Sequence, residues 1–164
     1  TVAYNIPGRT GVNMQPATLA RVANAFRNVV AVKEASGSLD QVSETLLACP
    51  KGFTVLSGDD SLTVPMMSVG AKGVVSVLSN VLPKETAAMV RAALAGDYKR
   101  AAAWHLRLLP VMKSLFVETN PIPVKAAAAR LGFGSPEPRL PLTPATPATV
   151  AALKAAWKKA GLRL

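Results

Sequence analysis

The sequence predicts an α/β fold with a parallel sheet, and three observations support this. Short apolar runs rich in β-branched residues alternate with helical segments through the first half of the chain. These runs are apolar at successive positions, which is typical of parallel strands covered on both faces. The second half is helical in pattern almost throughout. Two closures fit: an open doubly wound sheet, or four strands of a (β/α)8 barrel followed by a helical domain.

Four strands are expected, and each is followed by turn or helix signals. They cover residues 1–6, 29–32, 53–56 and 73–77. Pro7-Gly8 ends the first strand. Pro16 suits the first turn of a helix that runs to about Phe26. Ser38, with Gln41 three residues later, predicts a capping box for a helix that ends near Cys49. A further helix is expected over residues 62–69.

The rest of the chain is expected to be helical, with one long interruption. Helices are expected over residues 83–96, 97–116 and 124–131, with Asp97 as a cap and Pro110 as a kink. Residues 134–147 are rich in proline and indicate an extended connector. Thr146, Pro147 and Gly161 are typical of the cap, first position and end of a last helix.

Composition excludes some classes of protein. Half of the 164 residues are hydrophobic and 17% are charged, so a disordered chain is not expected. No apolar stretch reaches the roughly 18 residues of a membrane span. The net charge of +10 is spread along separate helical stretches without interleaved aromatic residues, which favours a solvated basic surface over a nucleic-acid or membrane partner. A single cysteine, Cys49, is consistent with a reducing, cytoplasmic location.

Polar side chains gather where the predicted strands end, which is where parallel α/β folds place their active sites. Tyr4 and Arg9 follow the first strand, Lys33 follows the second and Gly58 follows the third. Arg9 offers a planar fork that matches a carboxylate. The phenol of Tyr4 can donate and accept a proton. Gly58 would let a substrate approach the backbone closely.

Lys33 is the candidate nucleophile. It stands at the end of an otherwise apolar run, where an unpaired ammonium is costly, and a lysine that loses its proton can form a Schiff base with a carbonyl substrate. The alternative is a strand-end lysine whose stem packs while its head reaches water. Because side chains alternate along a strand, Lys33 should point into a barrel and Glu34 towards the helices.

Other reactive side chains carry weaker signals. Asp59 and Asp60 precede a predicted helix and are expected to cap it. His105, in mid-helix among apolar neighbours, is expected to be structural. No metal-ligand spacing occurs, and neither do the glycine-rich nucleotide loops or a nucleophile elbow. The usual metal-binding and nucleotide-binding motifs are therefore missing from the sequence.

Five ordered segments together resemble the dihydrodipicolinate synthase family, within the wider N-acetylneuraminate lyase superfamily. They are YNIPGRTG at 4–11, VKEASG at 32–37, LSGDD at 56–60, GVVSV at 73–77 and NPIPVK at 120–125. Their order and spacing fit along the entire chain. The resemblance implies the last four strands of a (β/α)8 barrel within residues 1–82. It also implies a closing barrel helix and a C-terminal helical domain within residues 83–164.

The resemblance also implies a reaction. Lys33 would form a Schiff base with pyruvate, and the derived enamine would attack aspartate semialdehyde to give 4-hydroxy-tetrahydrodipicolinate, in lysine and diaminopimelate biosynthesis. Tyr4 would relay protons, Arg9 would hold the carboxylate of the semialdehyde, and Gly58 and Val75 would line the pyruvate pocket. The resemblance further implies that no metal or organic cofactor is needed, and that the default assembly is a homotetramer. Another aldehyde substrate, or a non-catalytic binding module, are the alternatives.

The same resemblance leaves half of the family's barrel unaccounted for. The family's threonine-containing segment that binds pyruvate has no counterpart in this sequence. We therefore expect this chain to be the C-terminal part of a longer enzyme. Open strand edges and an exposed barrel interior predict self-association and little or no activity for the 164 residues alone.

Overall fold

The computed structural model describes residues 1–164, and the chain forms two compact units. The first unit comprises residues 1–76 and 90–98, and the second comprises residues 77–89 and 99–164. The predicted division of the chain between residues 82 and 83 stays a prediction.

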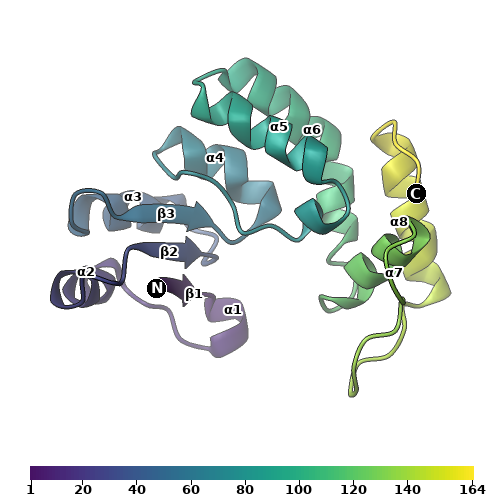
Figure 1. Ribbon diagram of the computed structural model, residues 1–164, viewed down its shortest axis with the longest axis horizontal. Helices are drawn as coiled ribbons and strands as arrows, with labels where there is room; N and C mark the ends of the chain where they lie inside the picture. The colour runs from purple at the N-terminus through teal and green to yellow at the C-terminus, as the bar shows by residue number, and fades with distance from the viewer. The chain divides into compact units, whose positions relative to one another are not determined.

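A three-stranded parallel sheet forms the centre of the first unit. Its strands are β1 (Val2–Asn5), β2 (Ala31–Glu34) and β3 (Thr54–Ser57), in the order β1-β2-β3. Figure 1 shows the three arrows pointing the same way. The register sets Tyr4 opposite Lys33, and Lys33 opposite Leu56. The sheet therefore brings the ends of all three strands to one edge.

Helices connect the strands, as the alternating pattern predicts. They are α1 (Pro7–Thr10), α2 (Pro16–Ala25), α3 (Leu39–Ala48), the 3-10 turn η1 (Asp60–Leu62) and α4 (Thr63–Ser68). Helix α3 packs against α2, β3 and α4. Val32 and Val55 are fully buried in the sheet, while Leu19 of α2 and Val42 of α3 are almost fully buried. This helix-covered face of the sheet is the core of the unit.

Two strand predictions are corrected by the structure. The second strand is two residues further along than the apolar run indicates, so Lys33 and Glu34 lie within β2 rather than after it. The predicted fourth strand is reduced to one parallel bridge between Ser57 and Val74. Ser57, the last residue of β3, donates its N–H to the carbonyl oxygen of Gly73 and accepts from the N–H of Val75, both at 2.8 Å, and β3 ends there. The pairing between the two segments therefore stops at this bridge.

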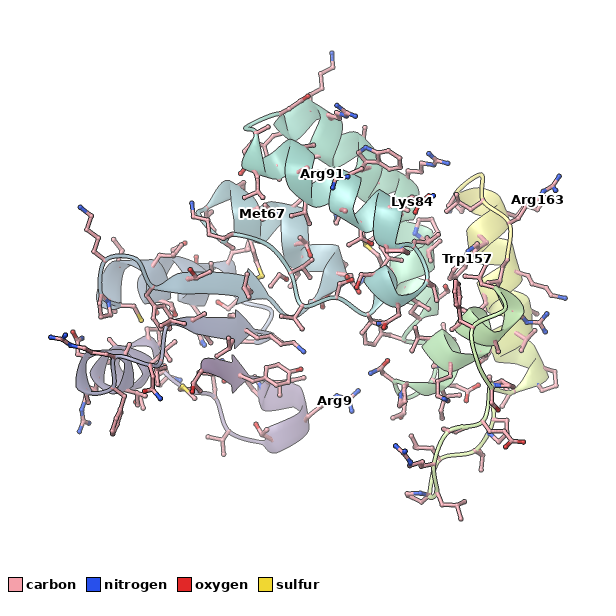
Figure 2. All side chains as sticks on the ribbon, in the orientation of Figure 1. Arg9, Met67, Lys84, Arg91, Trp157 and Arg163 are labelled. Carbon is pink, nitrogen blue, oxygen red and sulfur yellow. The ribbon has the colours of Figure 1, made fainter.

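The second unit is helical. Its described elements are η2 (Leu78–Asn80), α7 (Ile122–Arg130), α8 (Pro147–Lys159) and most of α6 (Tyr98–Ser114), while α5 (Pro83–Leu94) contributes residues to both units. Trp157 of α8, labelled in Figure 2, is 1% exposed, and Leu108, Leu115 and Leu153 are fully buried. Helix α7 packs against α8. None of the helices is long and apolar enough to cross a membrane.

The predicted helix caps are confirmed in part. Thr146 accepts a hydrogen bond from the N–H of Thr149, with Pro147 at the first position of α8. Ser38 likewise accepts from the N–H of Gln41 at the start of α3. The reciprocal half of that capping box is wrong, because the Gln41 side chain bonds elsewhere. That difference bears on the site.

Candidate active site

Tyr4 and Lys33 form the centre of the candidate site. They lie side by side on neighbouring strands, in direct register. The Nζ atom of Lys33 is 3.9 Å from the centroid of the Tyr4 ring. A cation over an aromatic face is attracted by the ring quadrupole. The ring of Tyr4, which is 46% exposed, therefore holds the amine at the open face of the sheet.

Gly58 lies directly against Lys33. A Cβ atom at position 58 would come within 3.2 Å of Lys33 Cε and 2.7 Å of Ala35 Cβ. The carbonyl oxygen of Glu34 already accepts a hydrogen bond from the N–H of Gly58. The close approach of these two strand ends thus requires glycine at this position for steric reasons.

Arg9 and Val75 lie on the segments that follow β1 and β3. Arg9 is exposed in the short helix α1, where its backbone N–H donates to the carbonyl oxygen of Ile6 at 3.0 Å and its guanidinium group makes no hydrogen bond or ion pair. Figure 2 shows its side chain extending outward from α1. Val75 is 43% exposed, and its N–H donates to the carbonyl oxygen of Ser57 at 2.8 Å. The structure thus pairs Tyr4 and Gly58 with Lys33, and it leaves Arg9 free to meet an anion.

A buried polar network lies on the opposite face of the sheet, and the sequence did not indicate it. Glu34, which is 2% exposed, accepts hydrogen bonds from Asn5, Ser36 and Gln41. Glu34 therefore points to the helices, as the strand alternation predicts. The available signal was the pair of polar residues, Asn5 and Glu34, each directly following a candidate site residue.

Asp59 takes the capping role that the sequence predicts, whereas the roles of His105 and Cys49 stay predictions. Asp59 accepts hydrogen bonds from the N–H and hydroxyl of Ser61 and caps η1. His105 lies half-buried in α6, where burial and the nearby Lys113 charge lower its pKa. Burial raises the pKa of the Cys49 thiol, which lies at the end of α3. No group of three or more His, Cys, Asp or Glu side chains could hold a metal ion.

An amine beside a phenol ring, at the carboxyl end of a parallel sheet, is an arrangement that can react with a carbonyl compound. The comparison with known proteins shows the family to which the chain belongs. The model of the dihydrodipicolinate synthetase family matches residues 1–160, and the chain belongs to that family. The structure is accordingly a partial barrel of the (β/α)8 class followed by helices.

Individual relatives are similar over almost the whole chain. The 4-hydroxy-tetrahydrodipicolinate synthase of Geotalea uraniireducens is 51% identical over 161 residues, which are 98% of this chain and 55% of that protein. The crystal structure of dihydrodipicolinate synthase from Aquifex aeolicus is 47% identical, with a TM-score of 0.95. It is matched over 99% of this chain and 56% of its own. The chain thus spans about half the length of the relatives it matches.

A third relative has been solved with a small molecule. It is a chloride-inhibited dihydrodipicolinate synthase from Acinetobacter baumannii complexed with pyruvate, 35% identical with a TM-score of 0.91. The match covers 98% of this chain and 55% of that one.

Proposed function

We propose that the protein containing this chain is a Schiff-base lyase that condenses pyruvate with aspartate semialdehyde to 4-hydroxy-tetrahydrodipicolinate. Membership of the dihydrodipicolinate synthetase family supports this proposal. The observation that carries it is the seating of the Lys33 amine over the Tyr4 ring, beside Gly58, at the carboxyl end of the sheet. The pyruvate complex of the Acinetobacter baumannii relative supports the choice of keto acid.

The first half of the reaction uses Lys33. Its unprotonated amine attacks the ketone carbon of pyruvate, and loss of water from the carbinolamine leaves an imine. Loss of a proton from the methyl group then produces an enamine, which is a carbon nucleophile. Tyr4 relays the protons in this proposal, and the contact between its ring and the Lys33 amine supports that role. Gly58 and Val75 line the space for the three-carbon substrate.

The second half uses Arg9. The enamine carbon attacks the aldehyde carbon of aspartate semialdehyde, and a planar guanidinium suits the carboxylate of that substrate. The Arg9 side chain is exposed and its guanidinium group has no hydrogen-bond or ion-pair partner, so its donors are available. The amino group of the second substrate then attacks the imine carbon, which closes the ring and releases the Lys33 amine. In this proposal the covalent intermediate on Lys33 replaces an organic cofactor.

Trapping the imine tests the proposal. The natural protein that contains this sequence is incubated with pyruvate and borohydride, and the mass of the peptide carrying Lys33 is measured by mass spectrometry. A mass gain at Lys33, absent from Lys33→Ala, supports a Schiff-base enzyme. The same protein with no gain at Lys33 overturns the proposal.

A panel of aldehydes tests the second substrate, because a related aldolase would share the imine. Aspartate semialdehyde should be the preferred acceptor, and Arg9→Ala should raise its KM at least tenfold. Preference for an uncharged aldehyde would overturn the assignment to the synthase and leave a related aldolase. We also propose, from the family resemblance, a cytoplasmic homotetramer. The mass of the natural protein in solution tests the assembly.

A further inference from the structure

The reacting side chains are backed by a buried polar network on the other face of the same two strands. Asn5 directly follows Tyr4 on β1, and Glu34 directly follows Lys33 on β2. Because neighbouring residues of a strand point to opposite faces, these two side chains lie behind the Tyr4–Lys33 pair. Asn5 is 3% exposed and Glu34 is 2% exposed. Both are therefore removed from water.

The Glu34 carboxylate has no ion-pair partner, and neutral donors surround it. Asn5 Nδ2 lies 3.1 Å from Oε1 and 3.0 Å from Oε2. The N–H of Ser36 donates to Oε1 at 2.6 Å, and Gln41 Nε2 donates to Oε2 at 3.2 Å. A buried carboxylate is stable only when such donors satisfy it. The strand end that carries Lys33 is thus tied to β1 and to α3.

Asn5 also ties down the segment that carries Arg9. Its Oδ1 accepts from the N–H of Met14 at 2.9 Å, and its Nδ2 lies 2.9 Å from Asn13 Oδ1. Asn13 in turn exchanges two hydrogen bonds with Gln41, at 2.8 and 3.0 Å. The segment of residues 6–15, which includes α1 and Arg9, therefore starts and ends at the same buried cluster.

We propose that Asn5 is a positioning residue for the site, acting with Glu34 to set the places of Tyr4, Lys33 and Arg9 together. This inference rests on the proposed function. One side chain bonds to the strand end behind Lys33 and to the far end of the Arg9 segment. Displacing a reacting group by about 1 Å can cost on the order of 10²-fold in rate. Loss of the Asn5 bonds should therefore affect both halves of the reaction.

The first test is Asn5→Leu, which keeps the approximate side-chain shape and removes every hydrogen bond. In the natural protein, we expect the rate of borohydride trapping with pyruvate to fall by about 10- to 100-fold. The KM for aspartate semialdehyde should rise as well, because the Arg9 segment loses its anchor. The matched control is Thr86→Val, which removes a buried 2.8 Å hydrogen bond in α5. It should lower the melting temperature and leave both kinetic readouts unchanged.

The second test exchanges donor and acceptor and does not depend on Asn5→Leu folding. Asn5→Asp alone sets two carboxylates face to face and should reduce trapping most strongly. In Asn5→Asp with Glu34→Gln, the Gln amide can donate to the new carboxylate, so trapping should recover at least tenfold. A structural role alone would restore the melting temperature without restoring trapping.

The outcomes separate this inference from the proposed function. A natural protein that gains no mass at Lys33 with pyruvate overturns the proposed function, and this inference with it. A natural protein that is labelled normally, while Asn5→Leu is labelled at the same rate with the same semialdehyde KM, overturns only this inference. This inference alone is also overturned if Asn5→Asp with Glu34→Gln regains the parental melting temperature but traps pyruvate as slowly as Asn5→Asp.

Discussion

Replacing Gly58 with alanine tests whether the close packing beside Lys33 is needed. The added methyl group would stand 2.7 Å from Ala35 Cβ, closer than such atoms approach in real proteins. It would also stand 3.2 Å from the carbonyl oxygen of Glu34 and 3.2 Å from Lys33 Cε. Ala35 Cβ and the carbonyl oxygen cannot rotate away, because backbone geometry sets their positions. The lysine stem is the only flexible neighbour of the three.

The structure gives a magnitude for two separate effects. Inserting a methyl group into a well-packed region typically costs about 1–3 kcal/mol in the free energy of unfolding. We expect Gly58→Ala to fall within that range, because the backbone must move to relieve the Ala35 contact. The Lys33 stem must also turn, which displaces the amine from the Tyr4 ring. Such a displacement should slow pyruvate trapping by about 10- to 100-fold.

Two further variants separate stability from chemistry. Gly8→Ala is the matched control for stability, since a Cβ there meets nothing within 4 Å. Its free energy of unfolding should stay within about 1 kcal/mol of the parent protein. Combining Ala35→Gly with Gly58→Ala removes the 2.7 Å contact and keeps those with the Glu34 carbonyl oxygen and Lys33 Cε. Stability should then recover in part while trapping stays slow.

Urea unfolding and trapping rates, measured side by side on the natural protein, would check the reasoning. If Gly58→Ala unfolds at the parental urea concentration and traps pyruvate at the parental rate, the steric argument is wrong. If the combined variant recovers trapping fully, the contact with the lysine stem has no effect on the reaction.

Three shorter predictions concern other parts of the chain. Hydrogen bonds from Thr149 and Thr146 lower the pKa of Glu118. The stabilisation by the Glu118 carboxylate is therefore complete above the ordinary glutamate pKa and is lost as pH falls through the lowered value. The melting temperature of Glu118→Gln should depend less on acid pH than that of the parent protein. Trp157→Ala should lower the free energy of unfolding in urea by about 3–5 kcal/mol, because the indole is 1% exposed. A smaller loss would show that neighbouring side chains move in to fill the cavity. The 164-residue chain alone should self-associate in light scattering, because β1 has one free edge and Tyr4 is 46% exposed. It should also show little or no synthase turnover, and a monomeric, active chain would contradict this prediction.

Much of the fold was predictable because its signals are local. The alternation of apolar runs and helical segments predicted the parallel sheet, and Ser38, Thr146 and Pro147 marked helix starts that the structure confirms. A cap needs only one side chain near its own backbone. The alternation of side chains also predicted that Glu34 would face the helices, and its bond to Gln41 bears this out.

Strand bounds were less predictable, because they depend on partners far along the chain. The apolar run 29–32 indicated a strand two residues before the observed one, since pairing begins only where Val2 meets Ala31. The run 73–77 is equally rich in valine, yet only Val74 forms a bridge. Its neighbour β3 ends at Ser57, which bonds to both Gly73 and Val75, so the pairing between the two segments stops there. Propensity does not contain that information.

The sequence by itself determined the class of fold, the helix starts and the candidate side chains Tyr4, Arg9, Lys33 and Gly58. Only the tertiary structure decided which of them meet, and it alone showed the network behind them. Gln41 illustrates the reason. Three residues after a serine it is expected to complete a capping box, but the buried Glu34 carboxylate needs a donor and Gln41 supplies it. A desolvated charge outweighs an exposed cap, and burial is a property of the folded chain.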